Sequence, residues 1–130
     1  MKTIAVIERG KDGTYGVFAP DLENVIIGDG ATVAEAKADF ENTFAEFIAY
    51  FQEEGKELRD VEFEYKYDIA SLFNYLDFIN VSKFAKWAGI NATLMRRYKS
   101  CTDTYISAAR AKQIEEALHR AGEELSAISL

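Results

Sequence analysis

The segment from Asn80 to Ser100 constrains the fold of this 130-residue chain more than any other. A small residue, Ala85, stands four positions before Gly89, and a glycine can turn the chain with a positive φ because it has no Cβ to clash. Apolar residues surround this turn at the spacing that two crossed helices need, namely Phe84, Ala88, Ile90, Met95 and Tyr98. The pattern predicts a helix-turn-helix; an ordinary helical hairpin with a solvated charged surface is the alternative.

The second helix of this motif would present polar and basic side chains to solvent. Amide, hydroxyl and guanidinium groups are those that bind the base edges and phosphates of DNA. Ser82 would begin the first helix, where exposed backbone amides can meet a phosphate. The predicted DNA-binding residues are Ser82, Asn91, Thr93, Arg96, Arg97 and Lys99.

The net charge of −7 is unevenly distributed along the chain. Residues 1–70 carry 7 Lys and Arg against 16 Asp and Glu, a net charge of −9, whereas residues 71–130 carry 8 against 6, a net charge of +2. Within residues 78–122 the balance is 8 against 3, or +5. The basic part suits a polyanion and the acidic part suits a basic partner, although acidity can also serve solubility alone.

Composition indicates a folded protein of one or two small domains. Hydrophobic residues make up 48% of the chain, which is enough for an apolar core. The single cysteine, Cys101, cannot form an intramolecular disulfide and suits a reducing compartment. No apolar run approaches the ~20 residues that cross a bilayer, and the N-terminus lacks the features of a signal peptide. We therefore expect a soluble cytoplasmic protein that does not bind membranes.

The first half predicts three strands in succession. The β-prone runs 3–8 and 14–19 flank Asp12-Gly13, a pair typical of hairpin turns. A third short strand is predicted at 24–28, with a loop at 29–31.

One helix and a fourth strand complete this half. Thr32 begins the helix, with Glu35 three residues later as a capping box, and Gly55 ends it. The strictly alternating run 61–67 predicts a half-buried strand. The resulting order, β-β-β-α-β, indicates a sheet with one helix on one face, similar in outline to part of a ribonuclease H core.

The second half predicts helices throughout, so the whole chain is expected to be α+β. An apolar helix at 71–78 would support the helix-turn-helix, and Ser107 would begin a long last helix. That helix carries a narrow apolar seam, which can close the domain's own core or pair with a second copy: Ile114, Leu118, Ala121, Leu125 and Ile128. The boundary between the halves is expected near 68–70.

Other chemistry finds little support in the sequence. His119, the only histidine, stands four residues after Glu115 and is best interpreted as half of a surface helix pair. Asp12, Asp21 and Asp29 stand in predicted loops, where aspartates more often make turns than bind the metals of a nuclease. We therefore expect no enzyme activity, no metal and no cofactor.

An ordered run of motifs extends through DGTYGVFAPDLENVIIGDGATVAEAKADFENTFAEFI. It comprises a hairpin, an aromatic strand, a Pro-Asp-Leu turn, a short strand, a Gly-Asp pair and a capped helix rich in Ala and Glu. In this order the motifs resemble the HicB antitoxin domain, over about Ile4 to Tyr67. The helix-turn-helix resembles the DNA-binding module that some members of that family carry behind this domain.

The resemblance implies the antitoxin of a two-gene toxin–antitoxin system. Residues 1–68 would neutralise a HicA-like toxin, a small basic ribonuclease, and residues 69–130 would bind operator DNA and repress the chain's own operon. Because one recognition helix reads few base pairs, a homodimer or higher even oligomer is expected. The candidate toxin contacts are Asp12, Tyr15, Asp21 and Asp29. The alternative is a stand-alone transcription regulator whose first domain senses a ligand or another protein.

Overall fold

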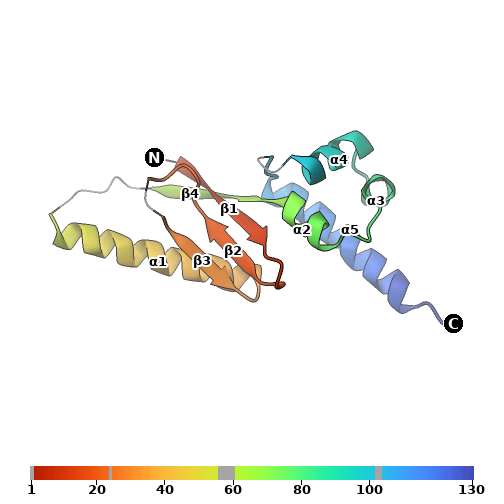
Figure 1. Ribbon diagram of the computed structural model, residues 1–130, viewed down its shortest axis with the longest axis horizontal. Helices are drawn as coiled ribbons and strands as arrows, with labels where there is room; N and C mark the ends of the chain where they lie inside the picture. The colour runs from red at the N-terminus through yellow and green to blue at the C-terminus, as the bar shows by residue number, and fades with distance from the viewer. Residues whose placement is uncertain (1, 24, 56–60, 102–103) are drawn as a thin grey trace.

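The computed structural model describes residues 2–23, 25–55, 61–101 and 104–130 (Figure 1). Within these ranges the chain has the α+β fold that the sequence predicts, and its elements follow the predicted order. The strands are β1 (Lys2–Arg9), β2 (Tyr15–Phe18), β3 (Ile27–Gly30) and β4 (Glu62–Tyr67), and the helices are α1 (Val33–Glu53), α2 (Ile69–Tyr75), α3 (Val81–Ala88), α4 (Ala92–Ser100) and α5 (Ala108–Ser126).

The four strands form one mixed sheet in the order β3-β2-β1-β4. β1 pairs antiparallel with β2 and parallel with β4, while β2 pairs antiparallel with β3. The β1–β2 hairpin turns at Gly13, whose φ of +84° favours glycine, and Asp12 accepts hydrogen bonds from the backbone and hydroxyl of Thr14. The predicted Asp12-Gly13 turn is therefore confirmed.

The third strand differs from its prediction. It runs from Ile27 to Gly30. Asp29 and Gly30, which were expected to lie in a loop, therefore pair with β2 instead. The reason is the closeness of α1: a Cβ on Gly28 would stand 2.6 Å from the carbonyl oxygen of Ala36, and a Cβ on Gly30 would stand 2.5 Å from the Ala36 nitrogen. These glycines serve helix–strand packing rather than a turn. Asn24, the first residue of the predicted strand, lies outside the described residues.

Helix α1 begins and ends as predicted. Thr32 Oγ1 accepts a hydrogen bond from the backbone N–H of Glu35 (3.1 Å), and the Glu35 carboxylate accepts one from the N–H of Ala31 (2.9 Å). After the helix ends, Gly55 adopts a φ of +71°. The helix buries Phe40 against the sheet, where its ring meets that of Phe63 edge to face with centroids 4.9 Å apart.

The remaining helices gather at one end of the sheet (Figure 1). Asp68 caps α2 by accepting a hydrogen bond from the N–H of Ser71, and the first helical residue is Ile69, two positions before the predicted start at residue 71. Ser107 begins α5 as predicted. These helices enclose a second apolar core, separate from the core between α1 and the sheet. Its largest fully buried side chains are Phe73, Met95 and Ile114.

The sheet and the helical part touch directly. Tyr67 and Ile106 exchange two backbone hydrogen bonds of 2.9 Å, and the backbone N–H of Arg9 donates to the hydroxyl of Ser71 (3.0 Å). The boundary at 68–70 thus falls at the start of α2, with no extended linker.

The apolar seam of α5 divides into two parts. Ile114 is buried and Leu118 packs against the helical core, whereas Leu125 and Ile128 are 62% and 60% exposed. Figure 1 shows the C-terminal half of α5 extending past the other helices. The first half of the seam closes the protein's own core, and the second half is left open.

Replacing Gly28 with alanine should lower the free energy of unfolding by about 1–3 kcal/mol, because the new methyl group would meet the backbone of α1. Urea denaturation measures this change. Gly122→Ala is the matched control, since no atom lies within 4 Å of its added Cβ and the helical site favours alanine by up to ~1 kcal/mol. A Gly28→Ala variant as stable as the parent would contradict the packing of α1 on β3.

Candidate functional site

The α3–α4 pair is built by two caps and one glycine. Asn80 begins α3 by accepting from the N–H of Lys83 (3.0 Å), and Asn91 begins α4 by accepting from the N–H of Leu94 (3.1 Å). Between them Gly89 has a φ of +71°, which reverses the chain within three residues. Figure 1 looks nearly along α3 but across α4, so the two helices cross. The turn predicted at Gly89 is confirmed.

The inner side of this pair is apolar, as the sequence predicts. All of the residues chosen from the spacing are buried at 8% exposure or less: Phe84, Ala85, Ala88, Ile90, Met95 and Tyr98. They belong to the core that α2 and α5 complete. Burial of this face fixes which side chains α4 turns to solvent.

The prediction for Ser82 is wrong in its local role. Asn80 rather than Ser82 begins α3, because Val81 is already helical and the Asn80 amide oxygen reaches the first exposed N–H groups. Ser82 lies inside the first turn, and its hydroxyl accepts a hydrogen bond from Arg96 Nη1 (3.0 Å). It still lies at the N-terminal end of α3, where backbone N–H groups carry partial positive charge.

Arg96 joins the two helices on their exposed side. Its Nη1 donates to Ser82 and its Nη2 donates to the hydroxyl of Thr93 (3.1 Å). A guanidinium has five N–H donors, so these two bonds leave donors for a ligand. The two hydroxyls hold the guanidinium in place before any ligand arrives, which lowers the entropy lost on binding.

The other predicted contacts of α4 lie on or near the same exposed surface. Asn91 is exposed, and its capping role occupies the amide oxygen but leaves the amide NH₂ group. Arg97 is exposed and Lys99 is partly buried, both in the last turn of α4. The six predicted residues thus come from the starts of α3 and α4 and from the outer face of α4.

Two lysines that the sequence interpretation left out extend this surface. Lys83 and Lys86 are exposed on α3. Lys86 lies one helical turn beyond Ser82 and so shares its face of the helix. The i, i+4 spacing from Ser82 could have identified Lys86, but the predicted basic residues were taken from the second helix alone.

Helix α5 braces the C-terminal end of α3. The indole N–H of Trp87 donates to the carbonyl of Ala117, and Arg120 donates to the carbonyl of Trp87, both at 3.0 Å. Gln113 donates to the carbonyl of Ala88 at the same distance. The bonds to the carbonyls of Trp87 and Ala88 satisfy acceptors that a helix end leaves without partners, and all three bonds fix α3 on α5.

The four candidate toxin contacts do not form one site. Asp12 and Asp29 line a shallow hollow of about 440 Å³ together with Glu8, and hydrogen bonds from the Thr14 side chain and backbone lower the pKa of Asp12. Tyr15 also borders this hollow, but its ring lies on the α1 side of the sheet and its hydroxyl accepts from Arg9 (2.8 Å). Asp21 follows the opposite end of β2, away from the hollow.

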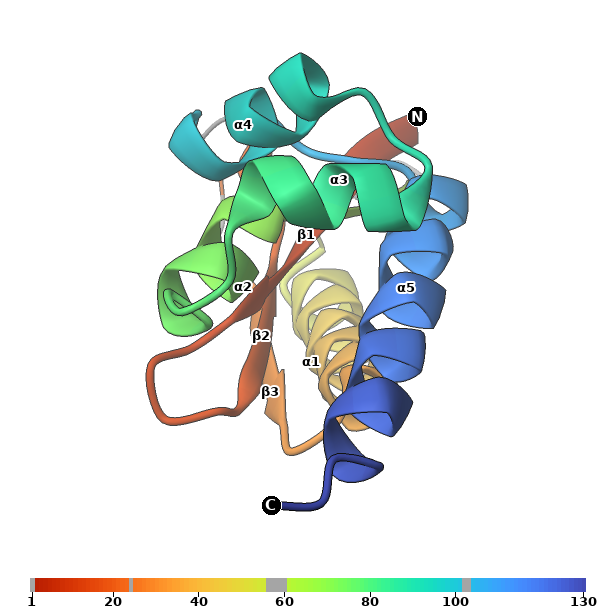
Figure 2. The same ribbon diagram turned by 90° about the vertical axis from the view of Figure 1, so that its right-hand side faces the viewer.

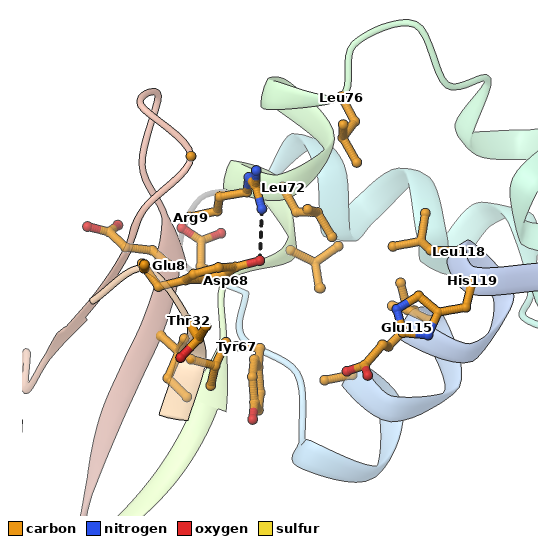
Figure 3. A pocket seen from close by; sticks show the side chains of 18 residues that line it. Glu8, Arg9, Thr32, Tyr67, Asp68, Leu72, Leu76, Glu115, Leu118 and His119 are labelled. Carbon is orange, nitrogen blue, oxygen red and sulfur yellow. Dashed lines mark hydrogen bonds between the residues drawn. The ribbon is translucent and has the colours of Figure 1, made fainter. Parts of the chain in front are cut away.

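A larger cleft of about 610 Å³ lies where the sheet meets α2 and α5 (Figure 3). Its lining is largely aliphatic, and Glu115 and His119 project toward it from α5. Arg9 lies at its rim, with its guanidinium 4.4 Å from the ring centre of Tyr75. Burial raises the pKa of Asp68, another lining residue, against the opposing effect of its backbone hydrogen bonds. The cleft can accept an apolar group of small-molecule size.

The His, Cys, Asp and Glu side chains of the described ranges are dispersed. No three His, Cys, Asp or Glu side chains there are grouped to hold a metal ion. Glu115 and His119 are exposed one turn apart on α5, consistent with a surface pair. No described helix has both the length and the apolar character to span a bilayer.

Comparison with known proteins gives no relative from which a function could be transferred. No protein-family model, curated protein or solved structure matches the chain. The function therefore has to be inferred from the residues and their geometry.

The capping role of Asn91 can be separated from any role in binding. Asn91→Ala should lower the free energy of unfolding by about 1 kcal/mol, because the N–H of Leu94 loses its acceptor. Asn91→Ser should retain most of that stability, since a serine hydroxyl also accepts this bond. Thermal and urea unfolding of both variants measure the difference; equal losses would show that the cap does not stabilise α4.

Proposed function

We propose that the chain is a HicB-type antitoxin that binds two partners through two surfaces. Residues 69–130 bind operator DNA through the α3–α4 helix-turn-helix and repress the chain's own operon. Residues 1–68 neutralise a basic, HicA-like, mRNA-cleaving toxin. The observation that carries the proposal is the Arg96–Ser82–Thr93 cluster on an exposed basic surface, in a chain whose other half is strongly acidic.

The DNA-binding half of the proposal rests on helix-turn-helix geometry. Such motifs direct the N-terminal part of the second helix at the floor of the major groove, which brings Asn91, Thr93 and Arg96 nearest the bases. Arg97 and Lys99 lie further along α4 and would meet the phosphate backbone. The N-terminal turn of α3 would meet a phosphate through its backbone amides.

The toxin-binding half rests on charge and on the ordered motifs of the sheet domain. Residues 1–70 carry a net charge of −9, which favours association with a basic RNA-binding surface. The same charge repels DNA, so the two ligands would use different parts of the chain.

A homodimer, or a higher even oligomer, would complete the DNA-binding unit. One α4 reads only a few base pairs, and two copies gain affinity by reading two half-sites about one turn apart. The open half of the α5 seam, with Leu125 and Ile128 exposed, offers an apolar face for the second copy.

The cleft beside α5 favours a second candidate function. A stand-alone transcription regulator could bind a small ligand in this cleft, between the sheet and the helices α2 and α5 that support α3 and α4. The neighbouring gene discriminates the two functions, since an antitoxin requires an adjacent short reading frame for a small basic protein.

Co-expression with that neighbour tests the antitoxin function. The neighbour alone should arrest growth, and the full chain should restore growth and co-purify with it. A neighbour that is not toxic, or a chain that neither binds it nor restores growth, would contradict the proposal and favour the stand-alone regulator.

Two substitutions test the DNA-binding surface. Arg96→Ala should weaken binding to the operator by about 1–3 kcal/mol and relax the preference at one position, because a base contact is lost. Lys99→Ala should weaken binding to all sequences and lower the slope of affinity against salt by about one, as expected for one lost phosphate contact. Fluorescence anisotropy on operator and scrambled DNA across a salt series measures both changes.

Lys11→Ala is the control for these variants, because Lys11 is an exposed lysine in the β1–β2 turn of the acidic part. It should leave the affinity for DNA unchanged. Unchanged affinity in Arg96→Ala and Lys99→Ala as well would show that the α3–α4 pair is a structural hairpin.

A further inference from the structure

One face of the sheet is left without a helix. Figure 2 shows the strands nearly edge on, with α1 on one side and no described helix over the middle of the other side. The strand registers show which side chains lie on this second face. One row across the sheet joins Ile27, Phe18, Val6 and Lys66, and the neighbouring row joins Asp29, Gly16 and Glu8. We call this surface the open sheet face.

The centre of the open sheet face is apolar. Ile27 is 52% exposed, and Val25, two residues earlier, is 86% exposed. Residues 25–29 alternate between exposed and buried, so Val25 and Ile27 point to the same side, away from the buried Ile26. Phe18 and Ile4 on the other strands are partly buried, and Val6, in the row of Ile27 and Phe18, is fully buried. Together these side chains form an apolar patch of the kind that marks interaction sites.

Carboxylates surround this apolar centre. Glu8 and Asp29 stand in the row beside it, and Asp12 joins them at the shallow hollow. On β4, Glu62 and Glu64 pair in register with Lys2 and Ile4 and so lie on the same face. The result is an apolar patch with an acidic border on two sides.

The acidic border is poorly neutralised by the chain itself. Lys66 pairs with Glu64 at 3.2 Å, but no described residue forms an ion pair with Glu8 or Asp29. Burial and the nearby charge of Asp68 raise the pKa of Glu8. Lys11 lines the same hollow but forms no ion pair with Glu8. A partner that supplies a Lys or Arg side chain would satisfy this charge.

We propose that the open sheet face is the docking surface for the toxin, a small basic protein with an apolar side chain at the centre of its contact and Lys or Arg around it. This inference rests on the proposed function, because it takes the toxin as the occupant. The apolar group would pack on Phe18 and Ile27, and the cations would pair with Glu8 and Asp29.

The charge of the face disfavours the other possible occupants. Two copies of the chain would bring like charges together at Glu8 and Asp29, and nucleic acid or an anionic membrane would be repelled by the same carboxylates. The candidate contacts are thereby revised: Asp12 and Asp29 lie at this face, whereas Tyr15 turns its ring to the α1 side.

Four full-length variants in two matched pairs test the proposal. Ile27→Lys and Asp29→Lys change an apolar and an acidic residue of the open sheet face. Tyr50→Lys and Glu46→Lys make the same kinds of change at exposed positions on α1. The probe is the small basic protein encoded beside the gene for this chain, and calorimetric titration measures its affinity for each variant.

Each variant of the open sheet face should bind the basic protein at least about tenfold more weakly than the parent chain, and each α1 variant should bind within about twofold of it. Affinity for operator DNA should stay unchanged in all four variants, which shows that the helical part folds, and cooperative thermal unfolding like that of the parent shows that the sheet domain folds. Parent-like binding of the basic protein by both Ile27→Lys and Asp29→Lys would overturn the docking surface while the proposed function stands. Failure of the parent chain to bind the basic protein would overturn both.

Discussion

The close contact between α1 and β3 determines which face of the sheet forms the core and which face is left without a helix. Gly28 and Gly30 have no side chains, so the helix backbone lies directly on the strand and shields one face of the sheet. The residues of that face, Phe63 among them, then form the core together with Phe40 of α1. Because strand side chains alternate, the residues that point the other way lie on the face without a helix, and the exposed apolar ones among them, Val25 and Ile27, become available to a partner.

The junction between the two cores joins the acidic part to the basic part without a linker. Arg9 has a central place there: its backbone donates to Ser71 of α2, and its guanidinium lies over the rings of Tyr15 and Tyr75. A cation held by two aromatic faces and a tyrosine hydroxyl is stabilised without a carboxylate partner. The hairpin of the sheet and the first helix of the helical part are thus tied to the same side chain.

Local signals in the sequence were sufficient for several caps and turns but not for the starts of α2 and α3, and long-range contacts were not visible in it. Thr32, Ser107 and Gly89 were predicted correctly because a cap or a left-handed turn depends on a few neighbouring residues. The predicted bounds of β3 were wrong because the role of Gly28 depends on α1, which packs on it from later in the chain. The side to which Tyr15 points likewise depends on strand register, where a shift of one residue exchanges the two faces. The bond between Ser82 and Arg96 follows from the crossing of two helices, which spacing alone does not fix.

Helix α5 links the two properties that a DNA-binding dimer needs. It accepts a hydrogen bond from the indole of Trp87 and donates to the end of α3 through Gln113 and Arg120, so it sets where the α3–α4 pair lies. Leu125 near its C-terminal end and Ile128 just after it are exposed to solvent. In the proposed dimer the same helix would therefore join the two copies and hold each reading helix. The separation of the two α4 helices, and hence the spacing of the half-sites, would follow from the packing of α5 alone.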